Sequence, residues 1–342
     1  MSTLALFAGL FLASLLLTGV LRNLALRVRM MDLPVDRSAH SQATPVGGGL
    51  VIVCLFALLA SYYLVAGVIP LAEYMALSGG VVIAVVGLID DLSPLDLRWR
   101  IPLQFGAAIW SVWWLGDVPP IGIGDWTLQV QWLLNGLAIV ALVWLLNLYN
   151  FMDGIDGLAG SELLFVNLSC LLFVISNEDQ VLGVLSGTLL AAGAGFLVWN
   201  WAPAKIFMGD VGSGFIGFTL GVLALFSMHH GSMTVWTWII LLAVFITDAS
   251  YTLARRYLAG ERWFEGHACH AYQNAARQYK SHGKVTITIL MINCLWLAPL
   301  AWISVQQPQL GVYLAVIAIL PLALLAGKFR AGMSIEVASL RE

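Results

Sequence analysis

Two amides and two carboxylates that could contact a nucleotide and a metal ion follow one another at steps of three residues: Asn147, Asn150, Asp153 and Asp156. A glycine comes directly after each aspartate, and the stretch interrupts apolar runs over 132–149 and 158–175. An α-helix turns by about 100° per residue, so a step of three drifts by about 60° and one face cannot hold all four. The glycines predict that a helix ends near Asn150 and that a tight loop turns the aspartates back toward the amides. Because polar groups at a membrane edge are costly unless they bind something, we interpret the stretch as part of a phosphotransfer site.

A second acidic group stands at the end of another apolar run, where Asp90 and Asp91 are adjacent. Neighbouring carboxylates repel each other, and a helix C-terminus adds further negative charge. A divalent metal or another cation would relieve this arrangement. A solvated acidic helix end explains the pair equally well, so both interpretations stay open.

A third polar loop runs from Asn200 through Lys205 to a glycine-rich segment around Asp210. Glycines at 209, 212 and 214 leave backbone N–H groups open just before an apolar run, and such a helix N-terminus favours anions. Asp210 beside it makes best sense with Mg²⁺ bridging a carboxylate and a phosphate.

Two basic loops are further candidates for contact with a substrate. In the first, His40 and Thr44 precede three glycines and could contact a phosphate, although a plain juxtamembrane loop explains this segment better on its own. The longest loop carries Arg255, Arg256, His267 and His270. Because zinc would need further ligands, we favour contact with phosphate and sugar over a zinc site or a solvated basic loop. Asp248, about two turns before these arginines, could pair within the bundle or serve the site.

The elements that must position these groups are membrane-spanning helices. The chain of 342 residues is 60% hydrophobic and 10% charged, whereas a soluble domain carries about 25% charge. A span needs about 20 apolar residues. We therefore expect an all-α polytopic membrane protein, one domain over 1–342, with eleven transmembrane helices near 3–21, 47–66, 72–89, 101–116, 130–149, 158–176, 181–199, 213–229, 234–254, 285–304 and 310–327.

The basic residues give the orientation. All 16 Lys and Arg residues fall in alternate connections between these spans or in the tail after the last one, and the positive-inside rule makes that set cytoplasmic. The N-terminus is then periplasmic and the C-terminus cytoplasmic. The outer connection over 116–129 allows a small hairpin, and His229 and His230 at an outer span end are expected to be structural. The cations are spread along a membrane face, so we expect a lipid bilayer and no nucleic acid as partner.

Taken together, the loops resemble the polyprenyl-phosphate N-acetylhexosamine-1-phosphate transferase family (glycosyltransferase family 4) over nearly the whole chain. The resemblance is carried by Asn-x-x-Asn-x-x-Asp-Gly-x-Asp-Gly over 147–157, Gly-Asp-x-Gly-Ser over 209–213, Asp90-Asp91 and 45–49. It implies that undecaprenyl phosphate attacks a UDP-amino sugar, releasing UMP and giving an undecaprenyl-diphosphate-sugar. The pattern looks closest to the branch that starts O-antigen and lipopolysaccharide synthesis, which uses UDP-GlcNAc or UDP-N-acetylfucosamine.

The resemblance also implies residue roles. Asp210 and Asp91 would bind Mg²⁺, with Mn²⁺ as a substitute, and the catalytic group would be Asp90, Asp91, Asp153 and Asp156. The substrate-binding group would be Asn147, Asn150, Asn200, Lys205, His40, Thr44, Arg255, Arg256, His267 and His270. The enzyme would lie in the bacterial inner membrane with its site facing the cytoplasm; a homodimer stays open.

The chain departs from the family in two places. The translocase branch carries a lysine soon after the acidic pair, where this chain has Leu92-Ser93-Pro94, and the family's clustered histidines are represented only by His267 and His270.

Two other functions compete with this interpretation. An ion-coupled secondary transporter would place charged groups near the midplane on broken helices and often shows internal repeats. Here the acidic groups lie at inner span ends, and the sequence shows no repeat. A lipid-binding structural subunit would not require two loops suited to a metal.

Overall fold

The computed structural model describes residues 3–33, 43–261 and 267–333. The described helices and strands, in chain order, are α1 (Thr3–Val28), β1 (Met31–Asp32), β2 (Thr44–Pro45), α2 (Gly49–Val65), α3 (Leu71–Leu92), α4 (Leu97–Leu115), β3 (Ile121–Ile123), β4 (Trp126–Leu128), α5 (Gln131–Phe151), α6 (Leu158–Asn177), α7 (Gln180–Asn200), α8 (Asp210–His229), α9 (Val235–Leu241), α10 (Ala243–Leu258), α11 (Ala271–Tyr279), α12 (His282–Ile292), the π-helix η1 (Asn293–Leu297), α13 (Ala298–Gln306), the 3₁₀ turn η2 (Pro308–Leu310) and α14 (Gly311–Lys328). Two antiparallel pairs, β1–β2 and β3–β4, complete the fold. The second confirms the hairpin predicted over 116–129.

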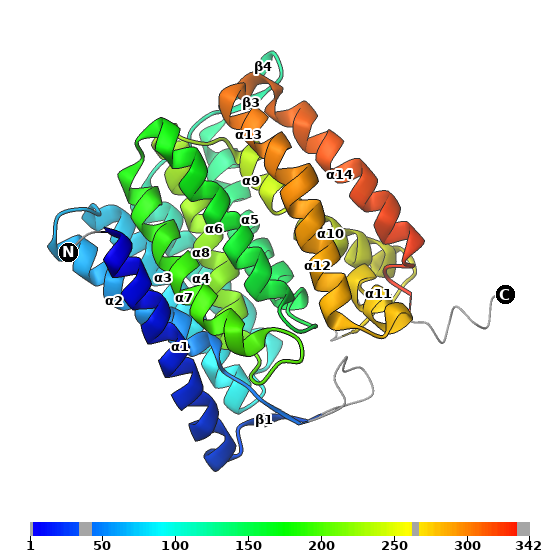
Figure 1. The fold of residues 1–342 in the computed structure, drawn as a ribbon. Coiled ribbons are helices and arrows are strands. Elements are labelled where there is room, and N and C mark those ends of the chain that lie inside the picture. Colours follow the sequence, from blue (N-terminus) through cyan, green and yellow to red (C-terminus); the bar gives the residue numbers. More distant parts are fainter. Residues whose placement is uncertain (1–2, 34–42, 262–266, 334–342) are drawn as a thin grey trace.

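The fold is an α-helical membrane bundle, as the composition predicted (Figure 1). Within the described residues, seven helices are long and apolar enough to cross a membrane, or eight if the bent pair α9 and α10 is one span. Helices α2, α4 and α6 occupy the expected spans 47–66, 101–116 and 158–176 but fall outside that count. The number eleven, the orientation and the division into one domain therefore stay predictions.

Helix α8 lies at the centre of the first eight helices and packs against α2, α3 and α5. Small residues let the neighbouring backbones come close, as is common in membrane bundles. A Cβ added to Gly49 would lie 2.3 Å from the Cα of Gly212, and one added to Gly87 would lie 2.4 Å from the carbonyl oxygen of Asp210. The glycines at 49 and 212 therefore serve the crossing of α2 and α8.

The segment that leads into α8 lies beside the start of α2. The N–H groups of Gly48 and Gly49 donate to the carbonyl oxygens of Phe207 and Met208, at 2.9 Å each. The three successive glycines at 47–49 allow a close backbone approach. The structure shows that the approaching group is this strip of the protein itself.

The last third of the chain is less regular. Helices α9 and α10 meet at an angle of 79°, so the expected span 234–254 is broken near its middle. Helix α12 continues through η1 into α13, and α14 packs against α9, α10 and α13. Figure 1 shows α10 and α11 between the lower halves of α12 and α14.

The polar loops meet at one end of the bundle. Helices α3, α5 and α7 end there, α6, α8 and α12 begin there, and α11 lies across it (Figure 1). We call this the basic end, because Arg100, Lys205, Arg277 and Lys284 lie in its loops and terminal helical turns.

Candidate active site

Asp210, the first residue of α8, is at the centre of a network that joins four helices. The side-chain amide of Asn150 on α5 donates to Asp210 Oδ1 at 2.7 Å and to Ser213 Oγ at 3.0 Å. Arg100 on α4 pairs with Asp90 on α3 at 2.6 Å, and its other terminal nitrogen lies 3.6 Å from Asp210 Oδ2. The two acidic loops and the Asn150 motif thus converge, as the sequence predicted.

Asp91 has a different position from its neighbour. Its two carboxylate oxygens accept the backbone N–H groups of Asp210 and Val211, at 2.9 and 3.1 Å. A helix N-terminus carries partial positive charge, so a carboxylate is favoured there. We expected these N–H groups to attract a phosphate; the structure shows Asp91 on them, in a position to hold α8 against α3.

A small cavity opens beside this network, lined among others by Asp90, Arg100, Gln104, Asn147, Asn150 and Asp210. Its volume of about 20 Å³ suits one water or one ion. The Asn147 amide donates to Gln104 Oε1 at 2.8 Å. Sequence reasoning did not assign Arg100 or Gln104 to the site. The signal for Gln104 was a polar residue inside the apolar run 101–116, and the signal for Arg100 was its place, with Arg98, shortly after Asp90 and Asp91.

Asp153 lies in the turn between α5 and α6, and the negative charges of neighbouring aspartates affect the ionisation of its carboxyl group. Burial raises the pKa of the Asp153 carboxyl well above its usual range, and the charges of Asp210, Asp91 and Asp156 raise it further. A cation among these carboxylates would favour their ionised forms.

Asp156 is held by other partners. Its Oδ1 lies 3.2 Å from His282 Nδ1, and its Oδ2 accepts the N–H of Ala204 at 3.0 Å. The Thr286 hydroxyl, one turn along α12 from His282, donates to the Asp156 carbonyl oxygen at 3.0 Å. Asp156 therefore joins the α5–α6 turn to α12 and to the loop before α8, and His282 was not foreseen from the sequence.

A larger polar cavity adjoins Asp156. Its volume is about 650 Å³, and Arg277, Lys280 and His282 are among the residues that line it. This cavity has the size of a small-molecule site, whereas the cavity beside Asp210 is far too small for a nucleotide.

Asn200 and Lys205 are structural in this arrangement. Asn200 is buried; its side chain accepts the N–H of Gly157 at 3.2 Å and donates to the Ile206 carbonyl at 3.0 Å. The Lys205 ammonium lies 5.6 Å from the centroid of the Trp199 ring. Neither side chain lines either cavity.

The two arginines predicted to bind substrate contact protein groups and line neither polar cavity. Arg255 donates to the Ala331 carbonyl oxygen at 3.1 Å, and Arg256 pairs with Glu261 at 2.7 Å. Asp248, whose role was open, accepts the N–H groups of Ala271 and Tyr272 at 2.9 Å each and so holds the start of α11.

The two loop histidines lie nearer the site. The His267 and His270 rings stack with centroids 5.0 Å apart, and each lies 6.0 Å from the ring of Phe151, two residues before Asp153. Thr44 is buried in β2. His40 lies outside the described residues.

The donor chemistry at Asp210 fits Mg²⁺. In the described parts of the chain, no three His, Cys, Asp or Glu side chains are arranged to hold a metal ion by themselves. Mg²⁺ is typically bound by one or two carboxylates together with substrate phosphates and water, so a complete protein cage is not needed. Within the network, Asp210 is the carboxylate that would hold it, whereas both oxygens of Asp91 already accept N–H groups.

A comparison with protein families finds a match over the residues that form this site. A family model described as glycosyl transferase family 4 matches residues 73–228, which include Asp90, the Asn147–Gly157 motif and Asp210. The part of the chain that carries the network around Asp210 is thus similar to a glycosyl transferase family.

Individual relatives narrow the class. A probable undecaprenyl-phosphate N-acetylglucosaminyl 1-phosphate transferase of Bacillus subtilis is 31% identical over 254 residues, 72% of this chain and 70% of the relative. A decaprenyl-phosphate N-acetylglucosaminephosphotransferase of Mycolicibacterium smegmatis is 30% identical, covering 83% of this chain and 77% of the relative. A phospho-N-acetylmuramoyl-pentapeptide-transferase of Moorella thermoacetica is 33% identical, covering 42% of this chain and 49% of the relative. The chain belongs to the polyprenyl-phosphate N-acetylhexosamine-1-phosphate transferase family.

Proposed function

We propose that the protein transfers an N-acetylhexosamine 1-phosphate from a UDP-sugar to undecaprenyl phosphate. An oxygen of the lipid phosphate attacks the β-phosphorus of the donor, the bond from that phosphorus to the bridging oxygen breaks, and UMP leaves with the bridging oxygen. The product is an undecaprenyl-diphosphate-sugar. We further propose UDP-GlcNAc or UDP-N-acetylfucosamine as donor, and the start of O-antigen or a related envelope glycan as the role.

The observation that carries this proposal is the convergence of Asn150, Arg100 and two further carboxylates, those of Asp90 and Asp91, around Asp210. Phosphoryl transfer needs mainly positioning and charge neutralisation. The attacking phosphate is already ionised at neutral pH, so no strong general base is required. Arg100 offers a fixed positive charge beside the carboxylates, and Asn150 fixes the rotamer of Asp210.

The polar cavity beside Asp156 is the proposed place for the donor. Arg277 and Lys280 provide positive charge to complement a diphosphate, and His282 fixes the carboxylate at the cavity wall. His267, whose ring stacks on His270 and lies 6.0 Å from the Phe151 ring, is the histidine proposed to contact the sugar, because His270 is buried and caps the start of α11.

Asp210 would hold Mg²⁺ together with the donor phosphates, and Mn²⁺ is the expected substitute. When bound, the ion would neutralise the negative charge of the diphosphate. The basic end would face the cytoplasm of the bacterial inner membrane, where nucleotide sugars are available, in agreement with the positive-inside rule.

The test is an assay of purified protein with undecaprenyl phosphate and a panel of UDP-amino sugars. We expect Mg²⁺-dependent release of UMP and one lipid-linked product, together with exchange of labelled UMP into the donor. If the protein moved solute across a vesicle membrane and left every UDP-sugar intact, the result would support an ion-coupled secondary transporter instead. The family membership does not favour that alternative.

A further inference from the structure

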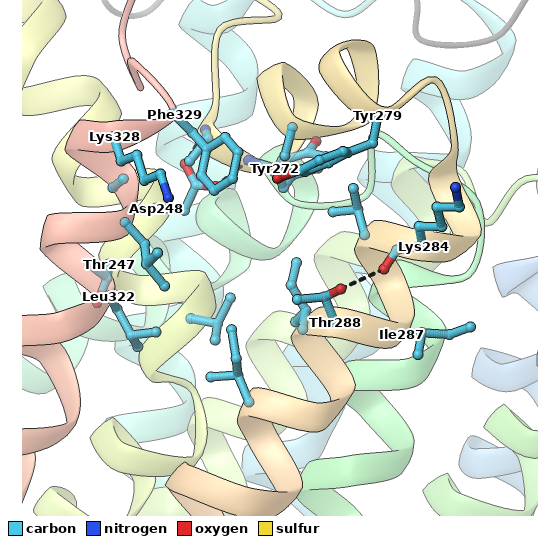
Figure 2. A pocket seen from close by; sticks show the side chains of 18 residues that line it. Thr247, Asp248, Tyr272, Tyr279, Lys284, Ile287, Thr288, Leu322, Lys328 and Phe329 are labelled. Atoms are coloured by element: carbon cyan, nitrogen blue, oxygen red, sulfur yellow. Dashed lines mark hydrogen bonds between the residues drawn. The ribbon is translucent and has the colours of Figure 1, made fainter.

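A third cavity, apolar and separate from the two already described, opens among α10, α11, α12 and α14 at the basic end (Figure 2). Its volume is about 600 Å³, within the range of ligand sites. Its walls are mainly aliphatic side chains, among them Val244, Ile289 and Leu322. Ile287 and Leu325 at its edge are exposed, so the cavity opens on the side where lipid surrounds the bundle.

Two cations lie at this cavity. Lys284, in the first turn of α12, and Lys328, at the end of α14, both line it, and both are exposed. Figure 2 shows them on opposite walls below a roof formed by Tyr272 and Tyr279. Among the residues that the structure describes, neither ammonium has a carboxylate within ion-pair distance.

Asp248, the acidic residue in the cavity wall, is already engaged. It accepts the N–H groups of Ala271 and Tyr272 and the hydroxyl of Thr252 at 3.2 Å. The lysines therefore leave positive charge over an apolar cavity at the level of the membrane surface. Such a site is complementary to a lipid that combines acyl chains with a negative headgroup.

The Tyr272 side chain closes the cavity toward the turn between α5 and α6, which holds Asp153 and Gly154. The Tyr272 ring lines the cavity, while its hydroxyl donates to the Phe151 carbonyl oxygen at 2.8 Å. A Cβ added to Gly154 would lie 2.2 Å from that hydroxyl, so the tyrosine fills the space between cavity and turn. A phosphate near Lys284 and Lys328 would thus be separated from the turn at Gly154 by the Tyr272 side chain.

We propose that this cavity binds an anionic diacyl phospholipid of the surrounding leaflet, as a stabilising lipid that takes no part in the transfer. The acyl chains lie along the aliphatic walls between α12 and α14, and the headgroup phosphate lies near Lys284 and Lys328. The lipid fills the space that the divergence of these two helices leaves at the basic end.

The experiment measures thermal unfolding of the full chain in detergent with added phosphatidylglycerol or phosphatidylcholine, and lipid retention by native mass spectrometry. We expect phosphatidylglycerol, but not phosphatidylcholine, to raise the melting temperature by about 2–4 °C and to be retained. Lys284→Ala/Lys328→Ala should lose both effects. Thr288→Phe, which narrows the cavity without changing charge, should weaken retention of phosphatidylglycerol.

The matched control is Arg27→Ala/Arg98→Ala, which removes two exposed cations from the same end but none from the cavity. It should keep the full response to phosphatidylglycerol. An equal response in the double lysine variant would overturn the proposal. So would displacement of phosphatidylglycerol by undecaprenyl phosphate with lysine-dependent retention of the latter, because the cavity would then hold the acceptor.

Discussion

The carboxylates of the site differ in what holds them, and this separates their roles. Asp90 pairs with Arg100, Asp91 caps α8, and Asp156 is held by His282 and the Ala204 N–H. Asp210 is oriented by one amide and keeps Oδ2 toward Arg100 at 3.6 Å. The same residue type thus serves as helix cap, loop connector and proposed metal ligand within one site.

We expect Asp210→Asn to lower turnover on the order of 10²–10³-fold or more, because it removes the charge proposed to hold Mg²⁺ while keeping the shape. The melting temperature should be unchanged or higher, since the charge of Asp210 disfavours ionisation of Asp153 nearby. Turnover and thermal unfolding of the purified variant check both. Lys205→Ala is the control and should have a mild effect, because Lys205 packs on Trp199; near-normal turnover in Asp210→Asn would contradict the assignment.

At the residue scale, the sequence identified the amides and carboxylates of the site but not the basic side chains that contact them. Asn150, Asp153 and Asp210 stand in polar, glycine-rich stretches, so composition alone marks them. Arg100 follows Asp90 by ten residues, but no local pattern distinguishes it from Arg98. His282 begins an apolar helix far along the chain from Asp156. Only the packing of α4 and α12 brings them to the carboxylates.

At the scale of elements, the first turn of α12 holds the second aspartate of the motif. His282 and Thr286 are four residues apart, so they share a helix face; one contacts the Asp156 carboxylate and the other its backbone carbonyl. The position of α12 therefore sets the shape of the cavity proposed for the donor.

We predict that His282→Leu raises the KM for the UDP-sugar about tenfold, because Asp156 loses a polar partner at the cavity wall, an effect on the order of 1–1.5 kcal/mol. His282→Asn should restore much of the affinity, since its amide nitrogen can take the place of Nδ1. Steady-state kinetics with the donor varied separates KM from kcat. Equal loss in both variants with an unchanged KM would show that the contact does not reach the donor.

The crossing of α2 and α8 gives a second prediction for an element. Gly49→Ala should lower the free energy of unfolding by about 1–3 kcal/mol, because its methyl group would overlap the Gly212 backbone. Gly136→Ala on α5 is the matched control: nothing lies within 4 Å of its added Cβ, so it should be neutral or stabilising. Chemical denaturation in detergent measures both. Equal stability of the two variants would place the helices further apart than the structure does.

Helix positions followed well from the sequence, and helix geometry did not. Every expected span has a helix within it, because a run of apolar residues bounded by polar loops has few alternatives in a membrane. The 79° bend between α9 and α10 had no signal, since the residues over 240–243 include neither Pro nor Gly. The bend leaves Asp248 on a separate helix, where its carboxylate accepts N–H groups at the start of α11.

Over the whole molecule, the two ends of the bundle carry different sets of polar residues. The basic end carries the site and both polar cavities. The other end carries a compact ionic cluster in which His230 contacts Glu73 at 2.8 Å and Asp179 at 3.0 Å. The Ser232 hydroxyl also donates to Asp179. The structural role expected for His230 is thus visible: it joins the start of α3, the start of α7 and the end of α8.

This cluster predicts how stability depends on pH. The hydrogen bond to Asp179, and then that to Glu73, raise the pKa of His230 from 6.5 to about 10, while hydrogen bonds from His230 and Ser232 lower the pKa of Asp179. A histidine with a raised native pKa stabilises the fold fully below its unfolded pKa and loses that contribution as pH rises toward the native value. The difference in melting temperature between wild type and His230→Gln should therefore be largest near pH 6 and shrink steadily toward pH 10. Thermal unfolding across this range measures it, with His229→Gln as the neighbouring control. A difference that stays constant from pH 6 to pH 10 would mean that the charge on His230 does not hold these three helix ends together.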